Sequence, residues 1–289
     1  MNQIKTVVLL GLLSALLIVI SSLVFGKGGA LIGLVLAAVM NFGSWYFSDK
    51  IALAAYGAQS VSPSEAPQLY NMVETLAQRA NLPMPGVYII PTDSANAFAT
   101  GRDPQHAAVA VTEGIMNILS DDELEGVIAH ELSHIKNRDT LTQAVAATIA
   151  GAISWLAQMA SYSMWFTGGS RDNREGSNPF ALLLTIILAP VAASIIQLAI
   201  SRTREFSADA SAAKLTRNPR ALARALQRLD SNARQMPMEG NPAFSPLLIM
   251  NVSAGDWLRN LFSTHPPTEA RIQNLLKVEA ELSNLPPGY

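Results

Sequence analysis

The sequence predicts a mainly α-helical, multi-span membrane protein with a small β-sheet. Only 15% of its residues are charged, against about 25% in typical soluble domains. A polar stretch between two pairs of apolar runs combines helical and strand patterns, which indicates a water-soluble region. Each apolar run is uncharged and long enough to cross a hydrocarbon core of about 30 Å. The four runs are residues 6–25, 28–47, 140–166 and 179–201.

The first two runs predict a tight transmembrane hairpin that makes up residues 1–50. Only Gly26 and Lys27 separate residues 6–25 from residues 28–47. A cleaved signal peptide is the alternative for the first run. That alternative is disfavoured because the apolar core is too long, no clear A-x-A site follows it, and a second span begins at once.

The last two runs predict a second hydrophobic hairpin within residues 140–201. Residues 179–201 are apolar nearly all round, whereas residues 140–166 carry a polar stripe. This stripe either packs against protein, which we favour, or lines a wet cavity near a functional site. Full spans and partial dips into the bilayer both fit these runs. The stripe comprises Gln143, Ser154, Gln158 and Ser161.

Basic residues beside the runs predict the orientation of the chain. Positive charge concentrates on the cytoplasmic side of membrane proteins. We therefore expect both termini and residues 51–139 in the cytoplasm. One side carries Lys5, Lys50, Lys136, Arg138, Arg202 and Arg204, and the other carries Lys27, Arg171 and Arg174.

The polar regions, residues 51–139 and 202–289, are expected to combine helices with short strands. Ser120 and Glu123 form a capping-box pattern that begins a long helix. Apolar residues at helical or strand spacing, separated by turn residues, predict the other elements. Helices are expected at residues 64–81 and 217–233, and strands at residues 86–90, 95–100 and 107–112.

Composition excludes several functions. A net charge of -2 without a basic stripe argues against nucleic acid as a partner. The absence of cysteine excludes thiolate zinc ligands, disulfides and a cysteine nucleophile. A metal transporter needs ionisable residues inside its spans, and the four runs contain none.

One motif carries the predicted chemistry. His130, Glu131 and His134 form an H-E-x-x-H pattern about ten residues into the helix that follows Ser120. Residues four apart share a helix face, so both imidazoles can bind one zinc ion while Glu131 takes a proton from a water whose pKa zinc lowers. Ser133 has no base arranged around it beyond the two motif histidines, so a serine nucleophile is not credible.

A catalytic zinc site typically has three protein ligands. Glu205 is the best candidate for the third, because it follows the fourth apolar run on a predicted helix. Asp209 lies one turn later and is placed to orient a ligand histidine. The alternative is that both carboxylates are solvated charges beside Arg202 and Arg204.

Together with the later sequence His265-Pro266-Pro267 and Arg271, these motifs resemble the gluzincin family of membrane metallopeptidases, which includes the CAAX prenyl protease and bacterial HtpX. Four apolar runs favour the HtpX-like branch over the seven-span CAAX relatives. The resemblance implies a gluzincin-type protease domain on one side of a bacterial inner membrane. It implies one zinc ion per chain, with misfolded or damaged membrane proteins or unfolded polypeptides as substrates.

The resemblance assigns the zinc ligands to His130, His134 and Glu205 and the catalytic base to Glu131. It also implies that His265 hydrogen-bonds the tetrahedral oxyanion and that Arg271 stabilises the site or the same charge; His265 could instead buttress the proline turn. The segment Asn96-Ala97-Phe98 is expected on an edge strand that lines the substrate groove, or it is an ordinary short strand.

Two rival functions are a processing protease of narrower specificity and a catalytically silent membrane scaffold. The scaffold would be favoured by loss of Glu131 or Glu205, and both are present. No motif specifies the natural substrate or the oligomeric state.

Overall fold

The structure is a computed structural model, and it describes residues 2–25, 28–150, 202–238, 244–250 and 266–283. Most of the predicted second hairpin lies outside the described residues, as does His265. The described helices and strands, in chain order, are α1 (Asn2–Phe25), α2 (Gly29–Tyr46), α3 (Ser48–Ala55), β1 (Gln59–Ser60), α4 (Pro67–Arg79), β2 (Gly86–Ile90), β3 (Ala97–Gly101), β4 (Ala107–Thr112), α5 (Glu113–Ile118), α6 (Asp121–Lys136), α9 (Arg202–Thr216), α10 (Pro219–Gln235) and α12 (Thr268–Ser283), with short 3₁₀ turns at Pro104–His106 and Ser245–Leu247.

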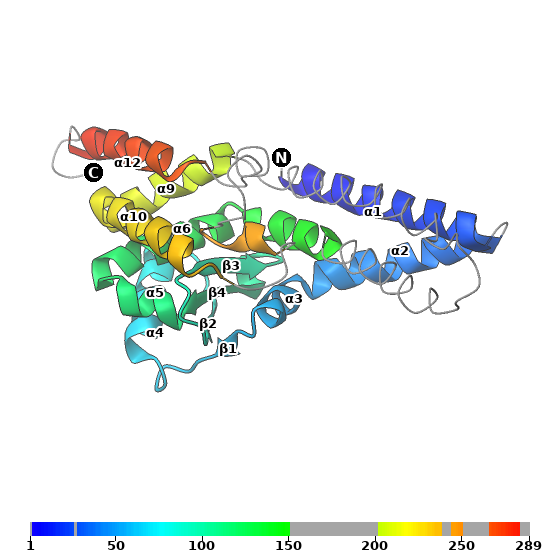
Figure 1. The fold of residues 1–289 in the computed structure, drawn as a ribbon, viewed down its shortest axis with the longest axis horizontal. Helices are drawn as coiled ribbons and strands as arrows, with labels where there is room; N and C mark the ends of the chain where they lie inside the picture. The colour runs from blue at the N-terminus through cyan, green and yellow to red at the C-terminus, as the bar shows by residue number, and fades with distance from the viewer. Residues whose placement is uncertain (1, 26–27, 151–201, 239–243, 251–265, 284–289) are drawn as a thin grey trace, which may run out of the picture.

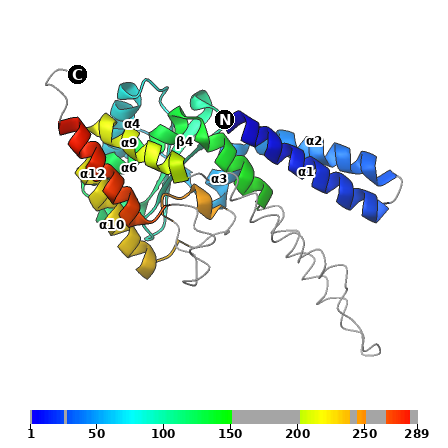
Figure 2. The same cartoon turned by 90° about the horizontal axis from the view of Figure 1, so that it is seen from above.

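The described part is mainly helical with one four-stranded sheet, as the sequence predicts. The strand order is β1-β2-β4-β3, with β2 and β4 parallel and the other pairs antiparallel. Helix α6 packs against β3 and β4 on one side and against α9 and α10 on the other (Figure 1). This central helix therefore lies between the sheet and the C-terminal helices, and α12 closes the assembly over α9 and α10 (Figure 2).

Local sequence signals explain where the central elements begin. The Ser120 N–H donates to the Glu123 carboxylate at 3.1 Å and completes the predicted capping box of α6. The Asn218 side chain caps α10 through the Ala221 N–H at 3.2 Å. Strands β2 and β4 have the predicted bounds, and β3 begins at Ala97 rather than at residue 95.

The core lies around the middle of α6. Val127, Ile128 and Leu132 are all fully buried, because the sheet, α9 and α10 surround this helix. Burial of such a side chain stabilises the fold by about 1.5–3 kcal/mol. Gly126 allows close approach of α10, since an added Cβ would lie 3.2 Å from the Leu222 backbone.

Helices α1 and α2 form a hairpin beside this domain (Figure 2). Small residues let the two backbones approach closely, as in membrane helix pairs. A Cβ at Gly33 would lie 2.6 Å from the Ile18 Cα atom, and one at Gly29 would collide with the Ser21 carbonyl. The Asn41 amide also donates to the Ser14 hydroxyl at 2.9 Å, although its oxygen has no hydrogen-bond partner within the described part of the chain.

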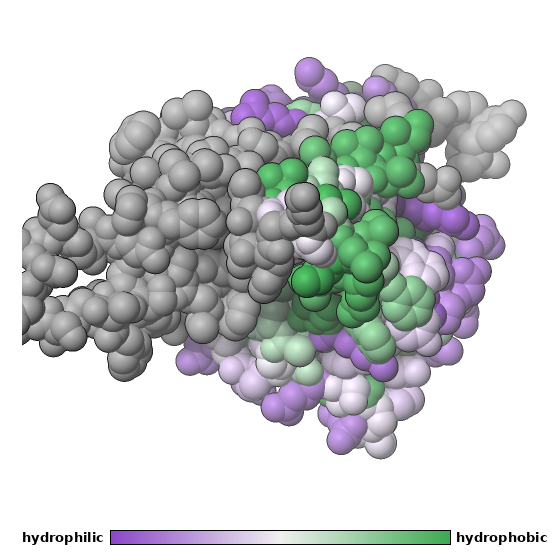
Figure 3. All heavy atoms as spheres, turned by 90° about the vertical axis from the view of Figure 1, so that its right-hand side faces the viewer, coloured by the Kyte–Doolittle hydropathy of each residue, from purple (hydrophilic) through white to green (hydrophobic). Residues whose placement is uncertain are grey.

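The hairpin has an apolar outer surface. Large side chains such as Leu31 and Val39 are more than half exposed, and Figure 3 shows apolar residues gathered at this end of the molecule. Among the described residues, α2 is long and apolar enough to cross a membrane, and α1 contains a shorter apolar stretch at Thr6–Val19. Thr6 also meets Thr142 at 3.0 Å, so α1 contacts the helical residues 139–150.

Candidate metal centre and active site

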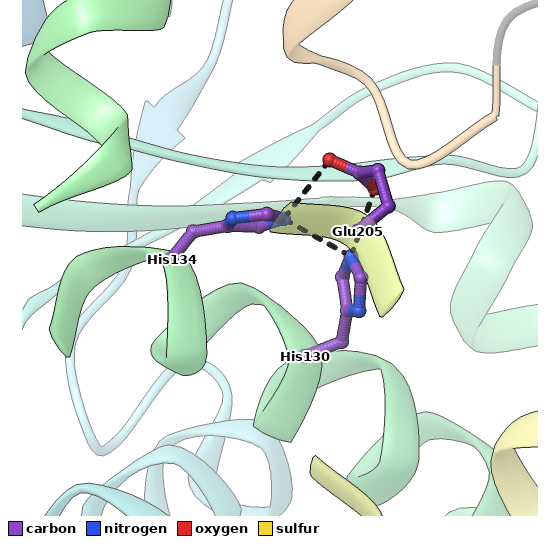
Figure 4. A group of neighbouring side chains, drawn as sticks. All are labelled: His130, His134 and Glu205. Carbon is purple, nitrogen blue, oxygen red and sulfur yellow. Dashed lines mark hydrogen bonds and ion pairs between the residues drawn. The ribbon is translucent and has the colours of Figure 1, made fainter. Parts of the chain in front are cut away.

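The two motif histidines lie one turn apart on α6 and face each other. Their Nε2 atoms are 3.2 Å apart, and their rings meet edge to face with centroids separated by 4.7 Å. His130 is 1% exposed and His134 5% exposed. Both imidazoles point towards Glu205, which α9 places above them (Figure 4). The geometry of the two helices thus brings the buried side chains of His130, His134 and Glu205 together at one point.

The Glu205 carboxylate completes this group. Its Oε2 atom lies 3.6 Å from Nε2 of His130, and its Oε1 atom lies 3.6 Å from Nε2 of His134. Glu205 and Asp209 are 1% and 0% exposed, so the alternative that they are solvated surface charges is wrong.

The spacing of these donors fits a zinc ion. Bonds of about 2.0–2.1 Å in tetrahedral geometry place neighbouring ligand atoms about 3.4 Å apart. The two imidazole nitrogens are 3.2 Å apart, and each lies 3.6 Å from a different oxygen of the Glu205 carboxylate, distances within a few tenths of an ångström of that value. Two imidazoles and one carboxylate, all buried, are also the donor set of many catalytic zinc sites. Both the spacing and the chemistry of these three side chains therefore fit a zinc ion.

Asp209 orients His130 from behind. Its Oδ1 atom lies 2.9 Å from Nδ1 of the imidazole, which directs Nε2 towards Glu205. Arg271 holds the same carboxylate with two donors, Nε at 2.9 Å and Nη2 at 2.7 Å. Burial alone would raise the pKa of Asp209. The interactions with Arg271 and His130 lower it by more than burial raises it, so the pKa of Asp209 lies below its ordinary value. The carboxylate is thereby kept ionised as an acceptor.

Asp139 does the same for His134, a contact that sequence reasoning missed. Its Oδ2 atom lies 3.1 Å from Nδ1 of His134, and Oδ1 lies 3.4 Å from Nη1 of Arg204. Asp139 follows Arg138, whose left-handed φ of 57° lies in the turn between α6 and the helical residues 139–150, and no local sequence pattern marks that turn. Each histidine therefore has its own buried aspartate.

Glu131 lies between α6 and the edge strand β3. It is 2% exposed, and the backbone N–H of Ala99 hydrogen-bonds to its carboxylate. Burial raises the pKa of Glu131, although nearby His130 and His134 oppose the rise. A carboxyl group with a raised pKa beside a metal site is suited to accept and return a proton.

The predicted substrate segment forms the start of β3, which is an edge of the sheet. Ala97 directs its carbonyl away from β4, whereas Phe98 pairs with Ala110 of β4. The Phe98 ring is fully buried against Tyr56, with centroids 5.5 Å apart, so its side chain belongs to the core. Asn96 is 2% exposed and lies at the same edge.

Two helix-borne histidines, a glutamate between them and a buried glutamate from a second helix are the arrangement of a zinc metallopeptidase. Comparison with known proteins identifies the family within this class. The model of peptidase family M48 matches residues 63–279. A protease HtpX homolog of Nostoc sp. is 69% identical over 98% of this chain and 99% of its own length, and one of Pyrococcus furiosus is 52% identical over 96% of each. The chain belongs to peptidase family M48, whose members are zinc-dependent.

A solved structure supports the same fold. The crystal structure of S. mikatae Ste24p matches with a TM-score of 0.52 at 20% identity, and the alignment covers 95% of this chain and 65% of that one. At this identity the likeness concerns the fold alone.

Proposed function

We propose that this metallopeptidase is a membrane-bound endopeptidase in which Glu131 is the general base. The observation that carries this proposal is the buried group of His130, His134 and Glu205, whose donor atoms already have the spacing of zinc ligands. His130, His134 and Glu205 would hold a zinc ion, which would polarise the scissile carbonyl and lower the pKa of water. Glu131 then accepts the proton of the attacking water at its carboxylate and returns it to the leaving amine.

The surrounding residues keep the ligands in position. Asp209 and Asp139 each accept a hydrogen bond from Nδ1 of a ligand histidine, which leaves Nε2 free to bind the metal. Arg271 places two donors on Asp209, and its Nη2 atom also lies 3.4 Å from the His130 ring. We therefore assign Arg271 to the support of Asp209. The oxyanion role of His265 stays a prediction, because this residue lies outside the described ones.

The substrate is an extended polypeptide that pairs with the edge strand. Metallopeptidases commonly add a peptide strand to a sheet edge, so that backbone hydrogen bonds give affinity without a fixed sequence. We assign such bonds to the outward carbonyl of Ala97 and the side-chain amide of Asn96, which lie two and three residues before Ala99, the residue whose N–H binds Glu131. Backbone recognition agrees with a role in the removal of unfolded or damaged proteins of varied sequence.

The apolar hairpin supports attachment to a membrane. Its small-residue seam at Gly29 and Gly33 and its exposed apolar surface are expected of helices in lipid. The basic residues beside the apolar runs favour a cytoplasmic active site in a bacterial inner membrane. Membrane proteins with misfolded cytoplasmic segments are then the nearest substrates.

Casein cleavage by detergent-purified protein tests this function. We expect Glu131→Gln to abolish cleavage and to retain zinc, because it removes the base and leaves the ligands in place. Glu125→Gln is the matched control, since Glu125 lies on the same helix and pairs only with the exposed Arg79 among the contacts shown. Zinc in all three proteins without cleavage by wild type would favour the silent scaffold, and full activity of Glu131→Gln would refute the mechanism.

A further inference from the structure

The edge of β3 that a substrate would use is already engaged by other parts of the chain. In this strand Ala97, Ala99 and Gly101 direct backbone groups away from β4. The Ala97 carbonyl accepts a hydrogen bond from the Ile249 N–H at 2.9 Å. The Ala99 N–H binds Glu131, and the Gly101 carbonyl accepts from the Thr140 hydroxyl at 2.9 Å. Every one of the five strand residues is accordingly buried.

Asn96 binds the same segment through both ends of its side-chain amide. The Nδ2 group donates to the Met250 carbonyl at 2.8 Å, and Oδ1 accepts from the Met250 N–H at 3.3 Å. A side-chain amide has the same donor and acceptor as a peptide group, so it pairs with Met250 as a neighbouring strand would. Ile249 and Met250 thus make three hydrogen bonds to Asn96 and Ala97, all through their own backbone.

The segment also lies beside the metal centre. The Ile249 carbonyl accepts from Nη1 of Arg271 at 3.4 Å, and Nη2 of the same guanidinium lies 3.4 Å from the His130 ring. Ile249 is 1% exposed and Met250 7% exposed. An extended polypeptide that adds to β3 next to the zinc ligands would need the same backbone partners.

We propose that residues 249–250 act as an internal pseudo-substrate that occupies the edge of β3 and must leave before a polypeptide can pair there. This inference rests on the proposed function, because it assumes that substrate binds along this edge. When residues 249–250 occupy the edge of β3, only a fraction of the molecules can bind substrate. The apparent dissociation constant of the substrate then equals its intrinsic value divided by that fraction. Each net hydrogen bond changes this equilibrium by a factor of roughly 2–13.

Ile249→Pro tests the proposal through a single backbone donor. Proline removes the N–H that binds the Ala97 carbonyl and leaves β3 unaltered. The preceding Leu248 has φ −71° and ψ 142°, which is the conformation that a following proline requires. Ile249→Val is the matched control, since it keeps the N–H and most of the buried side chain.

We expect Ile249→Pro to lower KM for an extended fluorogenic peptide by a factor of roughly 2–13, with the zinc content and kcat of wild type. Ile249→Val should keep the wild-type KM. An unchanged or raised KM in the proline variant, at normal zinc content and helicity, would overturn the proposal, because the segment would then be a fixed wall of the site.

Amide hydrogen exchange in the Glu131→Gln variant gives a second test, in which residues 249–250 keep their natural sequence. With a saturating unstructured casein peptide, we expect faster exchange at the Ile249 and Met250 amides, because displacement removes their acceptors on Ala97 and Asn96. Slower exchange at these two amides would overturn the pseudo-substrate and leave the proposed function intact, because the peptide would then bind without displacing the segment. Unchanged exchange there would also overturn this inference, whereas casein cleavage by wild type tests the proposed function separately.

Discussion

Asp139→Asn should weaken zinc binding, although Asp139 is not itself a predicted ligand. Its carboxylate lies 3.1 Å from Nδ1 of His134 and fixes the ring so that Nε2 faces Glu205. Loss of such a partner typically costs 10–100-fold in metal affinity. The contact is longer than the 2.9 Å between Asp209 and His130, and asparagine retains a neutral acceptor. We therefore expect the lower end, about tenfold or about 1.4 kcal/mol.

Competition with a fluorescent zinc chelator at neutral pH measures this effect on purified protein. Asp103→Asn is the control, because Asp103 binds His106 at 2.7 Å in another aspartate–histidine pair, on the surface. The control should have the zinc affinity of wild type. A wild-type dissociation constant in Asp139→Asn would refute the reasoning, since the contact with His134 would then contribute nothing to the metal site.

Three further predictions concern the metal site, the core and the hairpin. Glu205→Ala should lose both zinc and peptidase activity, since it removes one of the three proposed ligands, and metal analysis with a casein assay of the purified variant would show this. Leu132→Ala should lower the free energy of unfolding by about 2–5 kcal/mol, as measured by denaturant titration, because the side chain is fully buried. Gly33→Val should reduce accumulation of the protein in membranes, because its Cβ would lie 2.6 Å from the Ile18 Cα atom, whereas Gly43→Val, with no atom within 4 Å of an added Cβ, should accumulate normally.

The part of the site that lies on a single helix could be predicted from the sequence, because helix geometry is regular. A spacing of four residues was enough to place His130 and His134 on one face, and the capping box fixed the start of their helix. Glu205 was predicted from its position after an apolar run, and the structure brings it to the two histidines.

Contacts made by tertiary packing could not be read in the same way. Asp139 reaches His134 only because Arg138 takes a left-handed turn, and no local pattern marks that turn. Residues 249–250 lie about 150 positions from Asn96 in sequence, and their pairing uses backbone groups that every residue has. Such contacts leave no residue-type signal.

X-ray absorption at the zinc edge of the purified protein tests the central claim most directly. We predict about one zinc ion per chain, with only nitrogen and oxygen ligands at about 2.0–2.1 Å, two of them imidazoles. The Glu205→Ala variant should lack this spectrum. Two results would contradict the assignment of His130, His134 and Glu205 as the metal centre. One is wild-type protein that contains no zinc, and the other is a Glu205→Ala variant with the same zinc content and spectrum as wild type.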